Sequence, residues 1–313
     1  NTGIYTYYAE AYNSAGVTKS PEKSATVGTE KGYILIDGVD DYSIEFQTTI
    51  SQGTSTYKLT NRTNSSPNFS VVSSNTTVVK ASVSDNTLTL EGISDGRSGL
   101  LIVDETTGQY RQIGVRVKKK DGTLPGMPNY LSLGQVSEDT PNDLEFWRDI
   151  SYTDTNKRVD IRYIYLNDGP LEEGWYNWDQ GDGQRAKRYI NESLKLGMIP
   201  FFVFYNIPDK IESYDQDLKH INDKSYMEAY YKDLQFFLDL CKEYGDGDPV
   251  GIVLEPDFLG YMMQQNGAMP SEIEAKGVEG AYTSGIINKE TEPAFDNTIT
   301  GLVSSINYII NRE

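Results

Sequence analysis

The spacing of hydrophobic and polar residues changes twice along the chain. Within the first 28 residues, Tyr5, Tyr7, Ala9 and Ala11 alternate with other residues as they do in a half-buried β-strand. Between 29 and 122, short apolar runs are separated by Gly, Asn, Asp and Ser, without helical periodicity. From 123 to 313, strand-like and helix-like segments alternate. We therefore expect a multidomain chain: a few strands at 1–28, a β-sandwich at 29–122 and an α/β region at 123–313.

The middle region contains short apolar runs at 33–36, 42–46, 57–59, 69–72, 78–83, 88–90, 100–103 and 113–117. Strands at this spacing, separated by turn residues, are typical of a β-sandwich. The stretch 118–128 that follows contains three lysines together with Gly and Pro, and we interpret it as a solvated linker.

The C-terminal region alternates apolar runs with amphipathic segments. We expect strands at 130–136, 159–166, 199–205 and 249–254, and helices at 144–150, 183–196, 225–244 and 299–310. The continuous apolar run at 200–205 is typical of a parallel strand that is covered on both faces. A closed barrel needs eight strands and about 250 residues. The sequence therefore predicts either an α/β barrel that is truncated after about four β/α units or a smaller open sheet.

Charge and rare residues narrow the functional classes. The chain has 46 acidic and 28 basic residues, which gives a net charge of −18. This excess argues against nucleic acid and anionic membrane surfaces, and it suits a soluble protein with neutral partners. No stretch is long and apolar enough to span a membrane. With one histidine, His220, and one cysteine, Cys241, we expect neither a metal centre of several histidines nor an intrachain disulfide.

The remaining compositional signals concern cofactors and localisation. The sequence contains no phosphate-binding loop and no dinucleotide fingerprint, so we expect no cofactor. The chain begins at Asn1 inside a strand-like run, so any signal peptide would lie upstream. The 23 tyrosines and the many Thr, Ser and Asn residues fit a secreted or cell-surface protein.

Two carboxylates at the end of the strand 249–254, Glu255 and Asp257, are the strongest candidates for chemistry. Active sites of α/β folds lie at the C-terminal ends of the strands. A simpler interpretation is that these carboxylates cap the next helix or pair with a lysine. Trp175 and Trp178 follow the second strand, where they could stack on sugar rings. The alternative is that they pin this loop to the helix beginning near Gly183.

Two N-terminal segments resemble known structural domains. Residues 5–16 carry the run Tyr-x-Tyr-x-x-x-Ala-x-Asn-x-x-Gly, which resembles the last two strands of a fibronectin type III domain. Residues 86–92, 99–104 and 113–117 resemble strands of bacterial immunoglobulin-like surface domains. Both resemblances imply structural spacers. An isolated strand pair has open edges, so it must pack on the next domain, pair with another chain or stay poorly ordered.

The C-terminal region resembles glycoside hydrolase family six, the cellulases, most clearly over 198–313. The family motif Ile-Glu-Pro-Asp-Ser-Leu aligns with 254–259, which reads Leu-Glu-Pro-Asp-Phe-Leu, and the motif Tyr-Asp-Leu-Pro-Asp-Arg-Asp is matched at Tyr205, Pro208 and Asp209. The resemblance implies the first half of an α/β barrel and inverting hydrolysis of a β-1,4-glucan. It implies that Asp257 is the general acid. The further site candidates are Tyr205 and Asp209 as supporting residues, and Trp175, Trp178 and Glu255 for substrate binding.

The match to the family departs at one functional position. The last Asp of the family's upstream motif helps to raise the pKa of the acid, and its place is taken here by Ile211. Glu212 or Glu255 could supply the missing negative charge. The main alternative is therefore a non-catalytic surface, adhesion or filament-forming protein with a degenerate hydrolase-like domain. Such a protein could self-associate through its N-terminal strands. A carbohydrate-binding protein without turnover is a third hypothesis.

Overall fold

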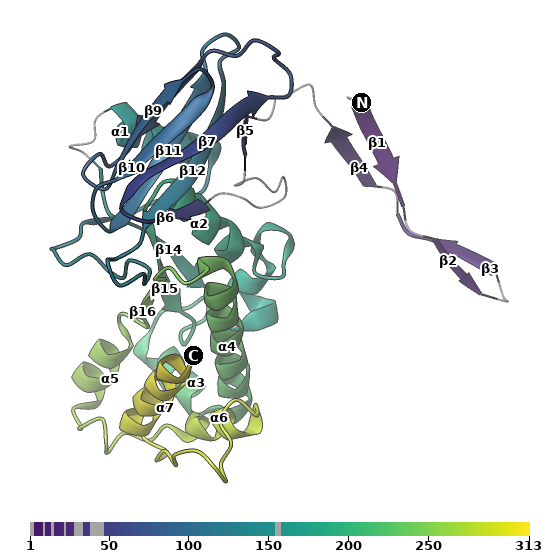
Figure 1. Ribbon diagram of the computed structural model, residues 1–313. Coiled ribbons are helices and arrows are strands. Elements are labelled where there is room, and N and C mark those ends of the chain that lie inside the picture. The colour runs from purple at the N-terminus through teal and green to yellow at the C-terminus, as the bar shows by residue number, and fades with distance from the viewer. Residues whose placement is uncertain are drawn as a thin grey trace.

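The computed structural model describes residues 3–8, 10–13, 16–21, 23–27, 34–37, 47–153 and 158–313. Mainly antiparallel sheets precede residue 120, and a parallel sheet with helices follows. Figure 1 shows the β-sandwich stacked on the amino-terminal end of the α/β region.

The N-terminal residues form two antiparallel strand pairs. The first joins β1 (Gly3–Tyr7) to β4 (Lys23–Val27), and the second joins β2 (Glu10–Asn13) to β3 (Gly16–Lys19). The sequence indicated only two strands here, whereas the structure contains four. The alternation of polar residues over 16–27 is too weak to reveal β3 and β4. In the described part of the chain, neither pair has a third strand.

The β-sandwich has two four-stranded sheets. One sheet has the order β5-β7-β10-β9, with the bounds Ile34–Ile36, Gly53–Asn61, Thr87–Gly92 and Val79–Ser84. The other has the order β6-β12-β11-β8, with the bounds Gln47–Ile50, Gln109–Val117, Gly96–Asp104 and Phe69–Ser73. Leu88, Leu90, Ile102 and Ile113 are completely buried in their shared core. The predicted strand at 42–46 lies outside the described residues, and β6 was not predicted.

The α/β region is built on a parallel sheet in chain order, β13 (Gly134–Val136), β14 (Ile161–Asn167), β15 (Ile199–Tyr205) and β16 (Gly251–Leu254). The helices are α1 (Pro141–Thr153), α2 (Gln184–Lys195), α3 (Tyr214–Asn222), α4 (Lys224–Gly245), α5 (Phe258–Asn266), α6 (Glu279–Thr283) and α7 (Ile299–Arg312). Short 3₁₀ helices lie at η2 (Leu171–Glu173), η3 (Trp175–Gln180) and η4 (Lys276–Val278).

Helices cover one face of this sheet and leave side chains exposed on the other. Phe202 and Phe204 of β15 point into the helical layer, where Phe237 of α4 packs against both rings. On the opposite face, the exposed fraction is 46% for Tyr165 and 42% for Val253. Parallel sheets are normally covered on both faces. The described residues therefore form an open four-stranded sheet with one uncovered side.

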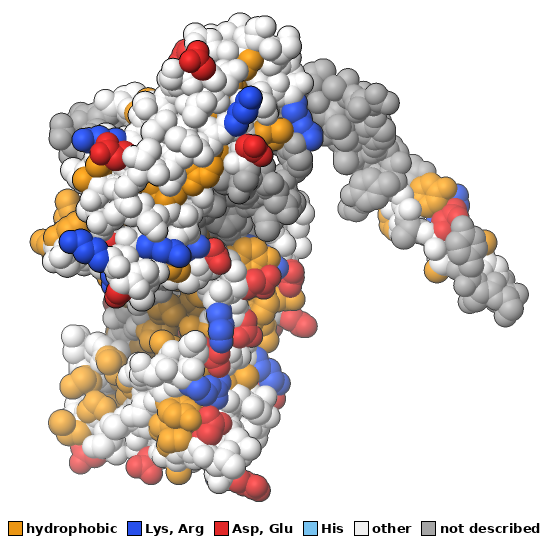
Figure 2. Space-filling view, viewed as in Figure 1, with side chains coloured by type: hydrophobic (Ala, Val, Ile, Leu, Met, Phe, Trp, Pro, Cys, Tyr) orange, Lys and Arg blue, Asp and Glu red, His pale blue; other side chains and the backbone are white. Residues whose placement is uncertain are grey.

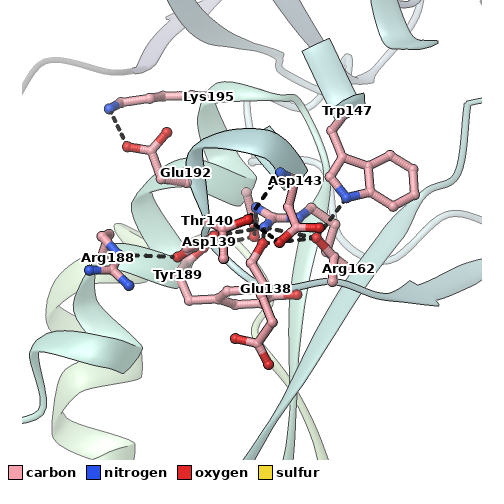
Figure 3. Close-up of polar contacts among 12 residues, drawn as sticks. Glu138, Asp139, Thr140, Asp143, Trp147, Arg162, Arg188, Tyr189, Glu192 and Lys195 are labelled. Atoms are coloured by element: carbon pink, nitrogen blue, oxygen red, sulfur yellow. Dashed lines mark hydrogen bonds and ion pairs between the residues drawn. The ribbon is translucent and has the colours of Figure 1, made fainter. Parts of the chain in front are cut away.

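A buried arginine ties the loop after β13 to the helical layer (Figure 3). The side chains of Arg162 and Asp139 are both fully buried, and Nη2 of Arg162 lies 2.7 Å from Oδ1 of Asp139. The same nitrogen donates to the backbone oxygen of Glu138 at 3.0 Å. The guanidinium also lies 4.5 Å from the ring centroid of Tyr189 in α2. An unpaired buried charge is costly, so these contacts hold the loop, β14 and α2 in one arrangement.

Two glycines bring the sandwich and the α/β region into backbone contact. Gly99 lies in β11, and Gly197 follows α2 with a φ of +71°. A Cβ atom on Gly197 would lie 2.4 Å from the backbone nitrogen of Gly99. A Cβ atom on Gly99 would lie 2.5 Å from the hydroxyl oxygen of Tyr152. Only glycine permits so close an approach at these positions.

A buried ion-pair cluster lies at the same junction. Oδ1 of Asp248 accepts a hydrogen bond from Nε of Arg97 at 2.8 Å, and Oδ2 accepts one from Nη1 of Arg116 at 3.3 Å. The side chain of Asp248 is 0% exposed, that of Arg97 is 7% exposed and that of Arg116 is 8% exposed. Arg116 also reaches Asp246 at 2.5 Å, but that carboxylate is 68% exposed. The two arginines come from β11 and β12, so one aspartate joins two sandwich strands to the turn before β16.

We expect Asp248→Asn to destabilise the chain far more than Asp246→Asn. Removing the charge of Asp248 leaves two buried arginines without their shared carboxylate, which should cost about 3–5 kcal/mol. Asp246 is exposed, and its loss should cost less than about 1 kcal/mol. Urea unfolding of the two variants and the parent measures both changes. Equal small losses would show that the charged cluster does not hold the junction together.

Candidate functional site

The C-terminal ends of β15 and β16 place the predicted carboxylates. Tyr205 is the last residue of β15, and β16 ends at Leu254, immediately before Glu255. Glu255 has a φ of +40°, which turns the chain away from the sheet toward α5. Asp257 occupies the N-cap position of α5, but its side chain makes no capping hydrogen bond. The interpretation of Asp257 as a helix cap is therefore wrong.

Asp257 belongs to a group of two carboxylates and two tyrosines. The hydroxyl of Tyr205 donates to Oδ2 of Asp257 at 3.3 Å, and the hydroxyl of Tyr261 donates to Oε1 of Glu212 at 2.8 Å. The hydrogen bond from Tyr261 lowers the pKa of Glu212, and contacts with Tyr205 and Asp257 lower it further. Burial, together with the neighbouring Glu212, raises the pKa of Tyr205. Glu212 is therefore ionised beside Asp257.

Ile211 stands where the family has an aspartate, so another carboxylate must take that place beside Asp257. Ile211 is 63% exposed, so it supplies neither charge nor packing to the group. Of the two carboxylates that could replace the family's aspartate, Glu212 is the one placed against Asp257 and Tyr205.

Asp217 is a third carboxyl group near this cluster, and sequence reasoning missed it. Its side chain is completely buried in α3, and neither carboxyl oxygen has a hydrogen-bond partner. Burial raises its pKa to about 7, and the negative charges of Glu212, Asp257 and Asp209 act in the same direction. The signal for α3 was present, because Ser213 accepts a hydrogen bond from the backbone of Gln216 in a Ser-x-x-Gln capping arrangement.

Glu255 holds the loop after β15 instead of facing a ligand. Its two carboxyl oxygens accept hydrogen bonds from the backbone nitrogens of Asn206 at 3.0 Å and Ile207 at 3.1 Å. Burial raises its pKa to about 8, against the opposing effect of these two bonds. The expectation that Glu255 binds substrate is therefore corrected, because both oxygens are occupied and the residue is 7% exposed.

Asp209 has a similar loop-holding role. Its φ is +56°, and its Oδ1 accepts a hydrogen bond from the backbone nitrogen of Ile211 at 3.0 Å. Oδ2 accepts one from Nε2 of Gln216 at 2.8 Å and lies 3.4 Å from Nε2 of His220. The His220 ring stacks on Tyr226 with centroids 3.7 Å apart. Asp209 thus holds the loop against α3, and its expected role as a support for Asp257 stays a prediction.

The two tryptophans differ in their surroundings. Trp175 is completely buried, and its Nε1 donates to Oδ2 of Asp233 in α4 at 2.8 Å. Its ring lies 5.8 Å from that of Phe236, with the planes 30° apart. Trp178 is half-buried against the same core. Trp175 therefore pins the loop to the helices, and the expectation that it is a sugar platform is wrong because no ring face is accessible.

An exposed apolar surface adjoins the carboxylates. Leu259 and Met263 lie one helical turn apart on α5, directly after Asp257, and are 44% and 47% exposed. Met269, just beyond the helix, is 61% exposed. Figure 2 shows hydrophobic side chains gathered over the region of α5. A ligand held at Asp257 would therefore meet apolar surface on the α5 side.

Two other kinds of feature are absent from the described residues. No three or more of their His, Cys, Asp and Glu side chains are arranged to hold a metal ion. Within the same residues, no helix combines the length and the apolar character needed to cross a membrane.

Comparisons with known proteins assign no family to this chain. No protein family and no curated protein matches it. Domains 4 and 5 of the S-layer protein SbsC share 17% identity over 37% of this chain and 58% of that structure, with a TM-score of 0.22. A family 39 glycoside hydrolase from the gut symbiont Bacteroides cellulosilyticus WH2 shares 12% identity over 80% of this chain and 48% of that structure, with a TM-score of 0.29. The endo-fucoidan hydrolase MfFcnA4 of glycoside hydrolase family 107 shares 13% identity over 44% of this chain and 23% of that structure, with a TM-score of 0.22.

The chain spans less than two-thirds of the length of each of these structures, at 58%, 48% and 23%. At these identities and TM-scores, neither the fold nor the function of the chain follows from them. The candidate site therefore depends on its own geometry.

Proposed function

We propose that the chain is part of a secreted or cell-surface glycoside hydrolase that cleaves a β-1,4-glucan with inversion. The observation that carries the proposal is the position of Asp257. Its carboxylate lies at the C-terminal ends of two adjacent parallel strands, is free of any helix cap and is contacted by Tyr205. In this proposal the four parallel strands are the first half of an α/β barrel, and Asp257 is the general acid.

A general acid must give its proton to the leaving oxygen. Asp257 is placed for this role at the strand ends, with the hydroxyl of Tyr205 hydrogen-bonded to it and the carboxylate of Glu212 beside it. In the reaction, the Asp257 proton passes to the glycosidic oxygen as the bond from this oxygen to the anomeric carbon breaks. Water attacks the anomeric carbon from the opposite face. Inverting enzymes activate this water with a second carboxylate about 6.5–9.5 Å from the acid.

In this proposal the polysaccharide lies across the C-terminal ends of the strands, beside Asp257. The exposed side chains of Leu259 and Met263 on α5 provide apolar surface next to this position. Apolar and aromatic surface suits the hydrophobic faces of pyranose rings. Trp178 keeps part of its surface exposed and remains a candidate sugar contact, whereas Trp175 does not.

A second candidate function is a non-catalytic surface or filament-forming protein. It is favoured by the two N-terminal strand pairs, which have no third strand in the part of the chain that the structure describes. Open strand edges can pair with another copy of the chain by β-strand addition. Concentration-dependent assembly without sugar release would identify this function.

Asp257→Asn should abolish most hydrolysis of soluble β-glucan. The amide cannot donate a proton as a carboxylic acid does, and loss of a general acid typically reduces the rate by about 10²–10⁴-fold. Reducing-sugar release measures the rate, and proton NMR of the first product identifies the anomer. Asp215→Asn, which alters an exposed carboxylate on α3, is the matched control and should retain activity. The activity is measured on the intact parent protein, and a folded parent that releases no sugar from any β-glucan would contradict the proposal.

Asp217→Asn should flatten the dependence of stability on pH. The folded-state pKa of about 7 lies above the ordinary value of 3.8, so folding strengthens proton binding. The resulting stabilisation is fully present below about pH 4 and is lost as the pH rises through 7. Asp217 therefore lowers the free energy of unfolding by at most about 1.4 kcal/mol for each pH unit between about pH 4 and pH 7. The Asp217→Asn variant should lack this contribution. Asp233 and Glu255, with pKa values of about 7 and about 8, contribute with the same sign and should leave a residual slope.

Urea unfolding between pH 4 and pH 8 tests this expectation. The Asp215→Asn variant again serves as the control, because it removes a carboxylate from the exposed side of the same helix. If the two variants and the parent have the same slope, Asp217 does not retain its proton in the folded chain.

A further inference from the structure

A cleft separates the sandwich from the amino-terminal ends of the parallel strands. Its volume is about 850 Å³, which falls within the range of small-molecule sites. It is lined from the sandwich by Thr77 and Ser94, and from the α/β region by Asp160 and Ile199. Because β15 has 7 residues, the cleft lies about 20 Å from the carboxyl end where Asp257 is found. We propose that this cleft is a second site, which binds a neutral oligosaccharide.

The walls of the cleft are fixed by the junction between the two domains. Arg97 lines the cleft, and its guanidinium is paired with Asp248. The same guanidinium donates to the backbone oxygen of Gly126 at 2.9 Å and to that of Pro125. The segment that was expected to be a solvated linker is therefore bound at 125–126 and forms one wall. A site with walls that are already in place loses less entropy on binding.

Tyr130 supplies an aromatic surface of the kind that sugars stack on. Its hydroxyl donates to Oδ1 of Asp160 at 2.9 Å, which fixes the end of the side chain. Oδ2 of Asp160 accepts a hydrogen bond from the backbone nitrogen of Leu133 at 3.2 Å, so the aspartate is itself held in place. Tyr130 nevertheless remains 56% exposed and lines the cleft. A tethered ring with an accessible face presents apolar area at little entropic cost.

The polar groups of the cleft favour an uncharged ligand. Arg97 is paired with Asp248, and Arg158 lies 3.6 Å from Asp160. The remaining charged residues on its lining are Lys119 and Asp95, one of each sign. A phosphate or sulfate group needs an excess of positive charge, and these pairs do not provide one. Hydroxyl and amide groups complete the polar lining, at Asn75, Thr77, Ser94 and Asn129.

These features together match a sugar chain: an aromatic face, hydroxyl and amide groups, and balanced charge. The inference does not depend on hydrolysis at Asp257, since the two sites lie at opposite ends of the strands. Where the chain does hydrolyse a glucan, the cleft would hold a distant part of the same polymer and raise its local concentration.

Calorimetric titration of the whole chain with cellohexaose, xylohexaose and mannohexaose tests the proposal. The Asp257→Asn background prevents turnover during the titration. Within it, Tyr130→Ala should raise the Kd of the bound hexasaccharide by about three- to tenfold, because it removes the stacking surface. Leu131→Ala is the matched control, since Leu131 is the adjacent residue, is 89% exposed and does not line the cleft. This variant should leave the Kd unchanged.

Tyr130→Phe keeps the ring but removes its hydrogen bond to Asp160, so it should bind nearly as well as the parent. Circular dichroism checks that each variant is folded. Absence of binding by all three hexasaccharides would overturn the proposal, as would a Kd that Tyr130→Ala leaves unchanged. Neither result bears on hydrolysis, which is measured separately by sugar release from the chain with Asp257 intact.

Discussion

The buried carboxylate of Asp248 is the contact on which the arrangement of the two main domains depends. It accepts hydrogen bonds from Arg97 and Arg116, and all three side chains are nearly inaccessible to water. Burying charges is costly, so the arrangement persists only where every partner is in place. Asp248 lies three residues before β16 begins. The contact that joins the domains therefore also fixes the strand that delivers Asp257, and it fixes the wall of the cleft through Arg97.

Burial governs the protonation of the acidic groups around the strand ends. Asp217 and Glu255 are both buried, which raises their pKa values to about 7 and about 8. Glu212 is exposed and hydrogen-bonded by Tyr261, which lowers its pKa. A cluster of acidic groups can therefore exist in a chain of net charge −18 without full mutual repulsion, because burial favours the neutral form of its inner members. The charge that remains is concentrated next to Asp257.

The regular elements could be predicted from sequence, whereas the contacts made by loop residues could not. Continuous apolar residues located β15 at 199–205, as observed, and helical periodicity located α4 within two residues of its bounds. Trp175 was misjudged because its burial depends on Asp233 and Phe236, which lie about sixty residues later in the chain. Asp217 was missed because a buried carboxyl without a partner has no local sequence pattern. Such features depend on tertiary packing, which periodicity does not encode.

The Gly99–Gly197 contact and the Asp248 cluster have a mechanical consequence. Any force applied to the sandwich passes to the α/β region through rigid backbone contact and through two guanidinium groups, so the covalent connection at 118–128 carries little tension. Arg97 holds the end of this connection at 125–126, which further shortens the segment that could stretch. Under a pulling force, the two domains would therefore move as one rigid unit, and the junction would yield only when the buried ion pairs break together.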